Sequence, residues 1–232
     1  MKVFALKITN KLDDLTSKSL LSVIEEKKRE RLLKFVFWQD MHRSLFADLL
    51  IRKILIEEYN YANEEIYFTV NEYGKPYFDN LNDFHFNISH SGDWVVCAID
   101  KKPIGIDIEE ISTIDLDISK NFFSDKEHND LLLSKDPFDY FFTLWSLKES
   151  YIKFLGKGLS HPLNSFSMRF LNERIVIESY DQILEKINFK QYQIDDAYKM
   201  ALCSLNLNMP EDVLIYTISD LINTFASVRI VS

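Results

Sequence analysis

The chain has 232 residues, of which 47% are hydrophobic and 27% are charged. A chain of this length and composition buries a substantial core without disulfides or a structural metal. Its net charge of -9 argues against nonspecific nucleic-acid binding, because a phosphate backbone repels an acidic surface. We find no signal-peptide pattern, and no apolar run approaches the roughly 18 residues that a membrane span needs. We therefore expect a cytoplasmic protein that binds neither nucleic acid nor membrane.

The first half of the chain is predicted to contain three longer strands and two helices. Residues 2–8 form the first strand, and the capping-box pattern Ser22-Val-Ile-Glu25 opens a basic helix. A longer amphipathic helix covers residues 40–59. The strands that follow are expected at residues 66–70 (a short one), 84–89 and 94–100. Between the first two of these, a turn at residues 71–76 holds Lys75 between a glycine and a proline.

The second half repeats this pattern of a long helix followed by strands. A strand covers residues 103–110, and Ser124-Asp-Lys-Glu127 is a capping box that opens a short helix. Asp136, Pro137 and Gly156 have the residue types expected at the two ends of a long helix. Strands at residues 165–170, 174–179, 188–194 and 198–205 and a helical turn at residues 219–224 complete the chain.

This repetition predicts an α+β fold made of a pseudo-duplicated pair of similar α/β subdomains, with the active site in the cleft between them. We place the N-terminal half at residues 1–102 and the C-terminal half at residues 103–232. Because one chain then supplies both walls of the cleft, we expect a monomer.

The strand from Pro103 to Glu110 is a candidate metal site. Its isoleucines at every second position face one way, so Asp107 and Glu109 face the other way, roughly 7 Å apart along the chain. Two carboxylates at this spacing reach one hard cation such as Mg²⁺, which prefers oxygen ligands. The alternative is an edge strand that carries two solvated acids.

The long helix carries a second group of charged residues. Glu149 and Lys153 are four residues apart and share a face, and Lys148 flanks them. Glu149 would be a third carboxylate, and the lysines would suit phosphate oxygens. The alternative is a surface ion pair worth about 0.3–0.5 kcal/mol. His90, at a polar strand end beside a turn, is either a phosphate contact or a structural histidine.

Three segments, taken in order, resemble the signature of the 4'-phosphopantetheinyl transferases. They are Phe86-Asn-Ile-Ser-His-Ser-Gly92, Ile104-Gly-Ile-Asp-Ile-Glu109 and Trp145-Ser-Leu-Lys-Glu-Ser-Tyr-Ile-Lys153. The chain length and the segment Gly156-Lys-Gly-Leu-Ser160 are similar to the surfactin-synthetase-activating (Sfp-type) branch rather than to the shorter holo-acyl-carrier-protein synthase type.

This resemblance implies that phosphopantetheine is transferred from coenzyme A to a serine hydroxyl of an apo peptidyl or acyl carrier protein domain. The implied Mg²⁺ ligands are Asp107, Glu109 and Glu149, and Glu149 is also the implied general base. Lys148 and Lys153 would steady the phosphates. The implied contacts of the nucleotide and its 3'-phosphate are Lys28, Arg31, Ser44, Lys75, Ser89 and His90. Arg31 stands where the family pattern has lysine.

The resemblance also implies that residues 111–123, which include Phe122 and Phe123, receive a helix of the carrier. The alternative is that these residues serve core packing.

Two other function classes remain open on the residues alone. A Mg²⁺-dependent phosphohydrolase or nucleotidyl transferase uses similar acids and lysines, but no Walker-type glycine loop or His-Asp metal doublet supports it. A noncatalytic module that binds coenzyme A or a carrier would not require all three acids.

Overall fold

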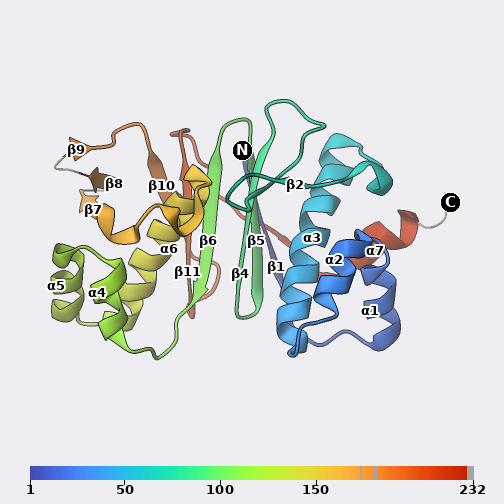
Figure 1. Ribbon diagram of the computed structural model, residues 1–232, viewed down its shortest axis with the longest axis horizontal. Helices are drawn as coiled ribbons and strands as arrows, with labels where there is room; N and C mark the ends of the chain where they lie inside the picture. Colours follow the sequence, from blue (N-terminus) through green and yellow to red (C-terminus); the bar gives the residue numbers. More distant parts are fainter. Residues whose placement is uncertain (173, 180–181, 229–232) are drawn as a thin grey trace.

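The computed structural model describes residues 1–172, 174–179 and 182–228, and it confirms the predicted α+β fold with two similar halves. In Figure 1 the long strands stand in the middle of the molecule, with helices on both flanks and a few short strands at the left edge. One sheet has the strand order β12-β1-β5-β4, and a second has the order β10-β11-β6. These strands are β1 (Lys2–Lys7), β4 (His85–Ser91), β5 (Trp94–Asp100), β6 (Ile104–Glu110), β10 (Asn188–Tyr192), β11 (Tyr198–Ser204) and β12 (Leu214–Tyr216).

The remaining elements surround these two sheets. The helices are α1 (Asp14–Leu21), α2 (Glu26–Leu32), α3 (Trp38–Tyr59), α4 (Ser119–Phe122), α5 (Asp125–Leu133), α6 (Pro137–Leu155) and α7 (Ile218–Val228). The short strands are β2 (Thr69–Val70), β3 (Pro76–Tyr77), β7 (Ser167–Leu171), β8 (Arg174–Ser179) and β9 (Gln182–Ile183). Single 3-10 turns are η1 (Asn63–Glu65), η2 (Leu116–Ile118), η3 (Gly158–Ser160) and η4 (Leu163–Ser165).

The two main sheets share an apolar core, and one long helix covers the outer face of each. Side chains of β1 and β5 meet Ile104, Ile106 and Ile108 of β6 in this shared core. The helix α3 packs on the other side of the first sheet, and α6 packs on the other side of the second. The residues that alternate with the isoleucines therefore face α6, as the period of two predicted.

Local sequence signals account for both ends of α6 and for the start of α5. The Asp136 carboxylate accepts the N–H of Asp139 at 3.0 Å, and Pro137 occupies the first turn. Gly156 ends the helix with a φ of 68°, in the left-handed region that glycine favours. Ser124 and Glu127 form the predicted capping box of α5.

The predicted capping box at Ser22 is wrong. Ser22 follows α1, and its hydroxyl donates to the carbonyl of Ser19 at 2.7 Å. The next helix, α2, begins at Glu26 and has no side-chain cap. The helix α1 was not predicted, although the Asp13 carboxylate caps its N-terminus. The strand expected at residues 66–70 is reduced to β2.

The C-terminal segment returns to the N-terminal half. β12 runs parallel to β1, with Phe4 opposite Leu214, and Phe225 of α7 enters the core around α3. The terminal segment therefore packs on the N-terminal half, although the boundary at residue 102 assigned it to the C-terminal half. That boundary stays a prediction. Among the described residues, no helix is both long and apolar enough to cross a membrane.

Candidate active site

The strands β4 and β6 lie side by side and are joined through side chains of β4. Three alternate polar residues of β4 make these bonds: Asn87, Ser89 and Ser91. The side-chain oxygen Oδ1 of Asn87 accepts the N–H of Ile106 at 2.8 Å. The hydroxyls of the two serines donate to Asp107 at 2.8 Å and to Glu109 at 3.1 Å. Asn87 and Ser91 were not predicted as site residues. Each lies two positions from Ser89, which indicates that all three face the same side of the strand.

Asp107 is the buried centre of the site. Its side chain is 1% exposed, and its Oδ1 accepts hydrogen bonds from Ser89 Oγ and, at 2.5 Å, from Lys153 Nζ. Burial raises the pKa of Asp107, and the Lys153 ammonium opposes that rise. Its Oδ2 is buried without a hydrogen-bond partner in the structure. A buried carboxylate oxygen in this state is costly, and a cation at Oδ2 would satisfy it.

Glu109 and Glu149 add two further carboxylates. Burial and the charge of Asp107 raise the pKa of Glu109 to about 7, and Glu149 contributes to this rise. The pKa of Glu149 is raised by the same two causes. The three acids are therefore electrostatic neighbours. Within the part of the chain that the structure describes, however, no three side chains form a preformed metal-ligand set.

The close approach of β6 and α6 brings these acids together. Gly105 of β6 packs directly against the backbone of α6, where a Cβ would lie 2.0 Å from the carbonyl oxygen of Ser150. Only glycine fits this contact without a shift of the strand or the helix. This contact holds α6 close to β6. Glu149 and Lys153, which project from α6 toward β6 and β4, are therefore held close to these strands.

Lys75 reaches the same region from the N-terminal half. Its ammonium donates to the backbone carbonyls of Ile104 at 3.0 Å and of Lys153 at 2.5 Å. Burial, together with the neighbouring Lys153 charge, lowers the pKa of Lys75 to about 8. A cavity of about 280 Å³ lies here, and its charged lining residues are Lys75, Glu149 and Lys153.

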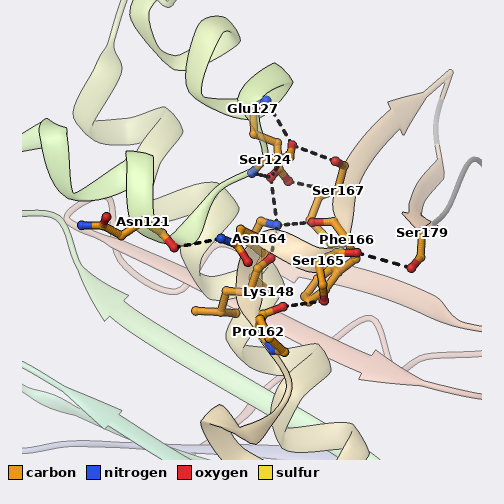
Figure 2. A network of polar contacts seen from close by, with 12 residues as sticks. Asn121, Ser124, Glu127, Lys148, Pro162, Asn164, Ser165, Phe166, Ser167 and Ser179 are labelled. Carbon is orange, nitrogen blue, oxygen red and sulfur yellow. Dashed lines mark hydrogen bonds and ion pairs between the residues drawn. The ribbon is translucent and has the colours of Figure 1, made fainter.

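Lys148 does not line this cavity, and its buried position does not support the predicted contact with phosphate. Its side chain is completely buried on another face of α6 (Figure 2). Its ammonium donates to the carbonyls of Leu163 at 2.9 Å and Phe166 at 2.6 Å, and it pairs with Glu127 at 2.8 Å. Glu127 also accepts the N–H of Met168 at 2.7 Å. These bonds satisfy the ammonium and fix α5 and the segment after η3 to α6.

The other predicted nucleotide contacts come from α2, α3 and β4, and none of them lines the cavity of Lys75. Lys28 of α2 pairs with the buried Asp48 of α3, and Arg31 is exposed. Ser44 of α3 is half-buried. Its neighbour Arg43 donates to the carbonyl of Gly92 at 2.9 Å, which joins α3 to the turn after β4. His90 is exposed on β4, on the opposite side of the strand from Ser89.

A larger groove of about 700 Å³ begins at Glu109 and follows the segment predicted to receive a carrier helix. Its apolar lining comes from Ile114 and Ile118 of that segment and from Phe141, Phe142 and Trp145 of α6. Its charged lining residues are all acidic: Glu109, Glu110, Asp115 and Asp117. Phe123, by contrast, is buried beneath the groove, so the alternative of core packing applies to that residue.

Comparison with known proteins agrees with this architecture. Residues 14–102 match the family described as "4'-phosphopantetheinyl transferase, N-terminal", and residues 103–203 match the "4'-phosphopantetheinyl transferase superfamily". The 4'-phosphopantetheinyl transferase Sfp of Bacillus subtilis (strain 168) is 41% identical over 224 residues, which cover 96% of this chain and 100% of that protein. The 4'-phosphopantetheinyl transferase gsp of Aneurinibacillus migulanus is 41% identical over 208 residues, which cover 88% and 86% of the two chains.

The chain therefore belongs to the 4'-phosphopantetheinyl transferase superfamily, and it is similar to the Sfp-type members along nearly its whole length. It is a transferase, and the comparisons favour neither the phosphohydrolase nor the noncatalytic binding module.

Proposed function

We propose that this protein transfers the 4'-phosphopantetheine arm of coenzyme A to a serine hydroxyl of apo peptidyl carrier domains, such as those of nonribosomal peptide synthetases. The serine oxygen attacks the phosphorus that bears the pantetheine arm. The bond from this phosphorus to the bridging oxygen breaks, and 3',5'-ADP leaves. Family membership supports the reaction, and the observation that carries the site assignment is the buried Asp107 between Ser89 and Lys153.

Lys153 and Lys75 are the proposed cationic contacts of the pyrophosphate and the nucleotide. Both line the cavity that Glu149 shares, and the Lys153 side chain is 27% exposed, which leaves it open to an incoming phosphate. Bound phosphate oxygens would compete with Asp107 for this ammonium. Lys28, Arg31, Ser44, Ser89 and His90 complete the proposed coenzyme A site on the N-terminal half.

Glu149 is the proposed general base. A carboxylate is an ordinarily weak base for an alcohol, so the proton leaves the serine as the oxygen attacks rather than beforehand. Burial and the charge of Asp107 raise the pKa of Glu149, which makes it a better proton acceptor than an exposed glutamate. The serine proton is thus held on the Glu149 carboxylate after transfer.

Asp107, Glu109 and Glu149 would hold a divalent cation, and we propose Mg²⁺. The unpaired buried oxygen of Asp107 and the mutually raised pKa values fit an oxygen-ligated cation. When bound, the ion would neutralise negative charge on the pyrophosphate and the leaving group. The side chains of Glu109 and Glu149 would turn toward it, because no closed ligand set is preformed among the described residues.

The carrier is proposed to dock in the groove beside Glu109. The groove leads from the exposed apolar Ile118 to the acids of the site, so a helix that binds there brings its serine toward Glu149. One chain supplies both walls of the cleft, so we propose that the enzyme acts as a monomer.

The test mixes the protein with coenzyme A, Mg²⁺ and an apo peptidyl carrier domain, and follows the intact mass of the carrier. We expect a gain equal to one phosphopantetheine arm that is abolished by EDTA and reduced at least a hundredfold in rate by Glu149→Gln, the scale of general-base loss. A carrier whose acceptor serine is replaced by alanine is the control.

If several apo carriers gain no mass although coenzyme A binds, the transferase proposal fails. If the carrier gains mass equally in EDTA-treated and Mg²⁺-supplemented samples, the reaction stands and the metal assignment fails.

A further inference from the structure

The turn between β2 and β3 is joined to the end of α6 by an asparagine that the proposed chemistry does not use. Asn71 Oδ1 accepts the N–H groups of Tyr73 at 3.0 Å and Lys75 at 2.9 Å. Asn71 Nδ2 donates to the carbonyl of Gly156 at 2.8 Å. The partners fix the orientation of the amide, because two are donors and one is an acceptor. One side chain therefore orders the turn and binds the end of the helix.

Packing around Gly156 supports the same connection. A Cβ at Gly156 would lie 3.2 Å from Lys75 Cδ and 3.4 Å from Asn71 Nδ2, so the turn rests closely on the end of the helix. The Lys75 ammonium adds its bonds to the carbonyls of Ile104 and Lys153. All these contacts cross from the N-terminal half to the C-terminal half.

The turn and the helix both line the cavity described above. Tyr73, Gly74 and Lys75 line it from the turn, and Glu149 and Lys153 line it from α6. The separation of the turn from the helix decides how far a nucleotide held at Lys75 lies from Glu149 and Lys153. That separation depends on the bond between Asn71 and Gly156, together with the bonds of the Lys75 ammonium to Ile104 and Lys153.

We propose that Asn71 is a positioning residue, which holds the Lys75 turn against the catalytic helix and so sets the geometry between bound coenzyme A and Glu149. This inference rests on the proposed function. Asn71 touches no reacting atom and acts through Gly156 and Lys75. Geometric errors of about 1 Å cost up to a hundredfold in rate, so such a contact is large enough to matter.

Asn71→Asp tests the proposal, because it keeps the acceptor for the two turn N–H groups, replaces the donor to Gly156 with a carboxylate oxygen and adds one negative charge. We expect kcat to fall about tenfold, as expected from lost positioning, while the Kd for coenzyme A changes less than about threefold. Hydrogen exchange of the backbone N–H groups at residues 153–158 should become faster. Asn71→Ala, which also frees the turn, should in addition weaken coenzyme A binding. Glu72→Gln, an exposed change in the same turn, is the matched control.

Wild-type kcat and exchange in Asn71→Asp would overturn the inference. A lower kcat with unchanged exchange at residues 153–158 would overturn it too, because the loss would then come from the added charge. If the wild-type protein transfers nothing to any carrier, the proposed function fails, whereas the exchange and coenzyme A binding measurements still test the link between the turn and the helix.

Discussion

Gly105 of β6 and Ser150 of α6 are in backbone contact, with no space for a side chain between them. A Cβ at Gly105 would lie 2.0 Å from the Ser150 carbonyl oxygen and 2.3 Å from the backbone nitrogen of Phe154. The obstructing atoms belong to helical backbone, so they cannot rotate away. This contact allows Lys153 and Asp107 to form their ion pair across the two elements.

Gly105→Ala should therefore push α6 away from β6. We expect the free energy of unfolding to fall by about 1–3 kcal/mol, as for other overpacked sites. We also expect kcat to fall more than tenfold in the folded fraction, because Glu149 and Lys153 move with the helix. Thermal unfolding and the carrier mass assay measure the two effects. A variant with wild-type stability and rate would contradict the close approach.

Lys148→Met should destabilise the protein without changing its ligand site. Removing this ammonium leaves the Glu127 carboxylate buried and unpaired, which costs about 3–5 kcal/mol. Urea denaturation should show that loss, and the double variant Glu127→Leu with Lys148→Met should recover most of it.

The coenzyme A affinity of folded Lys148→Met should stay within about twofold of wild type, because Lys148 lies outside the proposed coenzyme A site and effects at separate sites are largely independent. Lys153→Met is the comparison and should weaken binding strongly. If Lys148→Met is stable but loses its affinity for coenzyme A, Lys148 contacts the phosphates after all.

Coenzyme A binding should weaken as the pH rises through about 8. Burial and Lys153 lower the pKa of Lys75 to about 8, so the free enzyme carries this positive charge below that pH and loses it above. Lys75→Arg keeps its charge at all accessible pH values and should remove this dependence. Calorimetric titrations between pH 7 and pH 9 (about one unit on each side of the shifted pKa) measure it. Parallel profiles for both proteins would exclude Lys75 as the titrating contact.

The acidic lining of the groove should disfavour carriers that present an acidic helix. Asp117→Asn removes one charge from this lining, and rim charges act mainly on association rate. We expect kcat/KM for an acidic carrier to rise about twofold to fivefold relative to a neutral one, within the range of rim-charge effects. Asp212→Asn, an exposed change outside the groove lining, is the control. Equal ratios for wild type and Asp117→Asn would exclude charge selection by this residue.

The sequence by itself determined the features that depend on backbone neighbours. Asp136 caps the start of α6 and Gly156 caps its end, each through hydrogen bonds within the adjacent helical turn. Ser124 caps the start of α5 in the same way. The alternation around Asp107 predicted which side chains face the core, because a strand has a period of two. The three motifs also sufficed to indicate the family. Ser22 shows the limit, since a matching local pattern ended one helix instead of starting the next.

Only the tertiary structure decided which charges around Glu149 belong to the site. Lys148 and Lys153 flank the same glutamate, but at 3.6 residues per turn they point roughly 140° apart. The sequence does not show which of these two faces is buried, so both lysines were expected to contact phosphate. Packing of α5 and the segment after η3 buries Lys148 against Glu127, whereas β4 and β6 receive Lys153. The partners of Asn71 and the return of β12 to β1 were decided in the same way, by contacts between residues far apart in the chain.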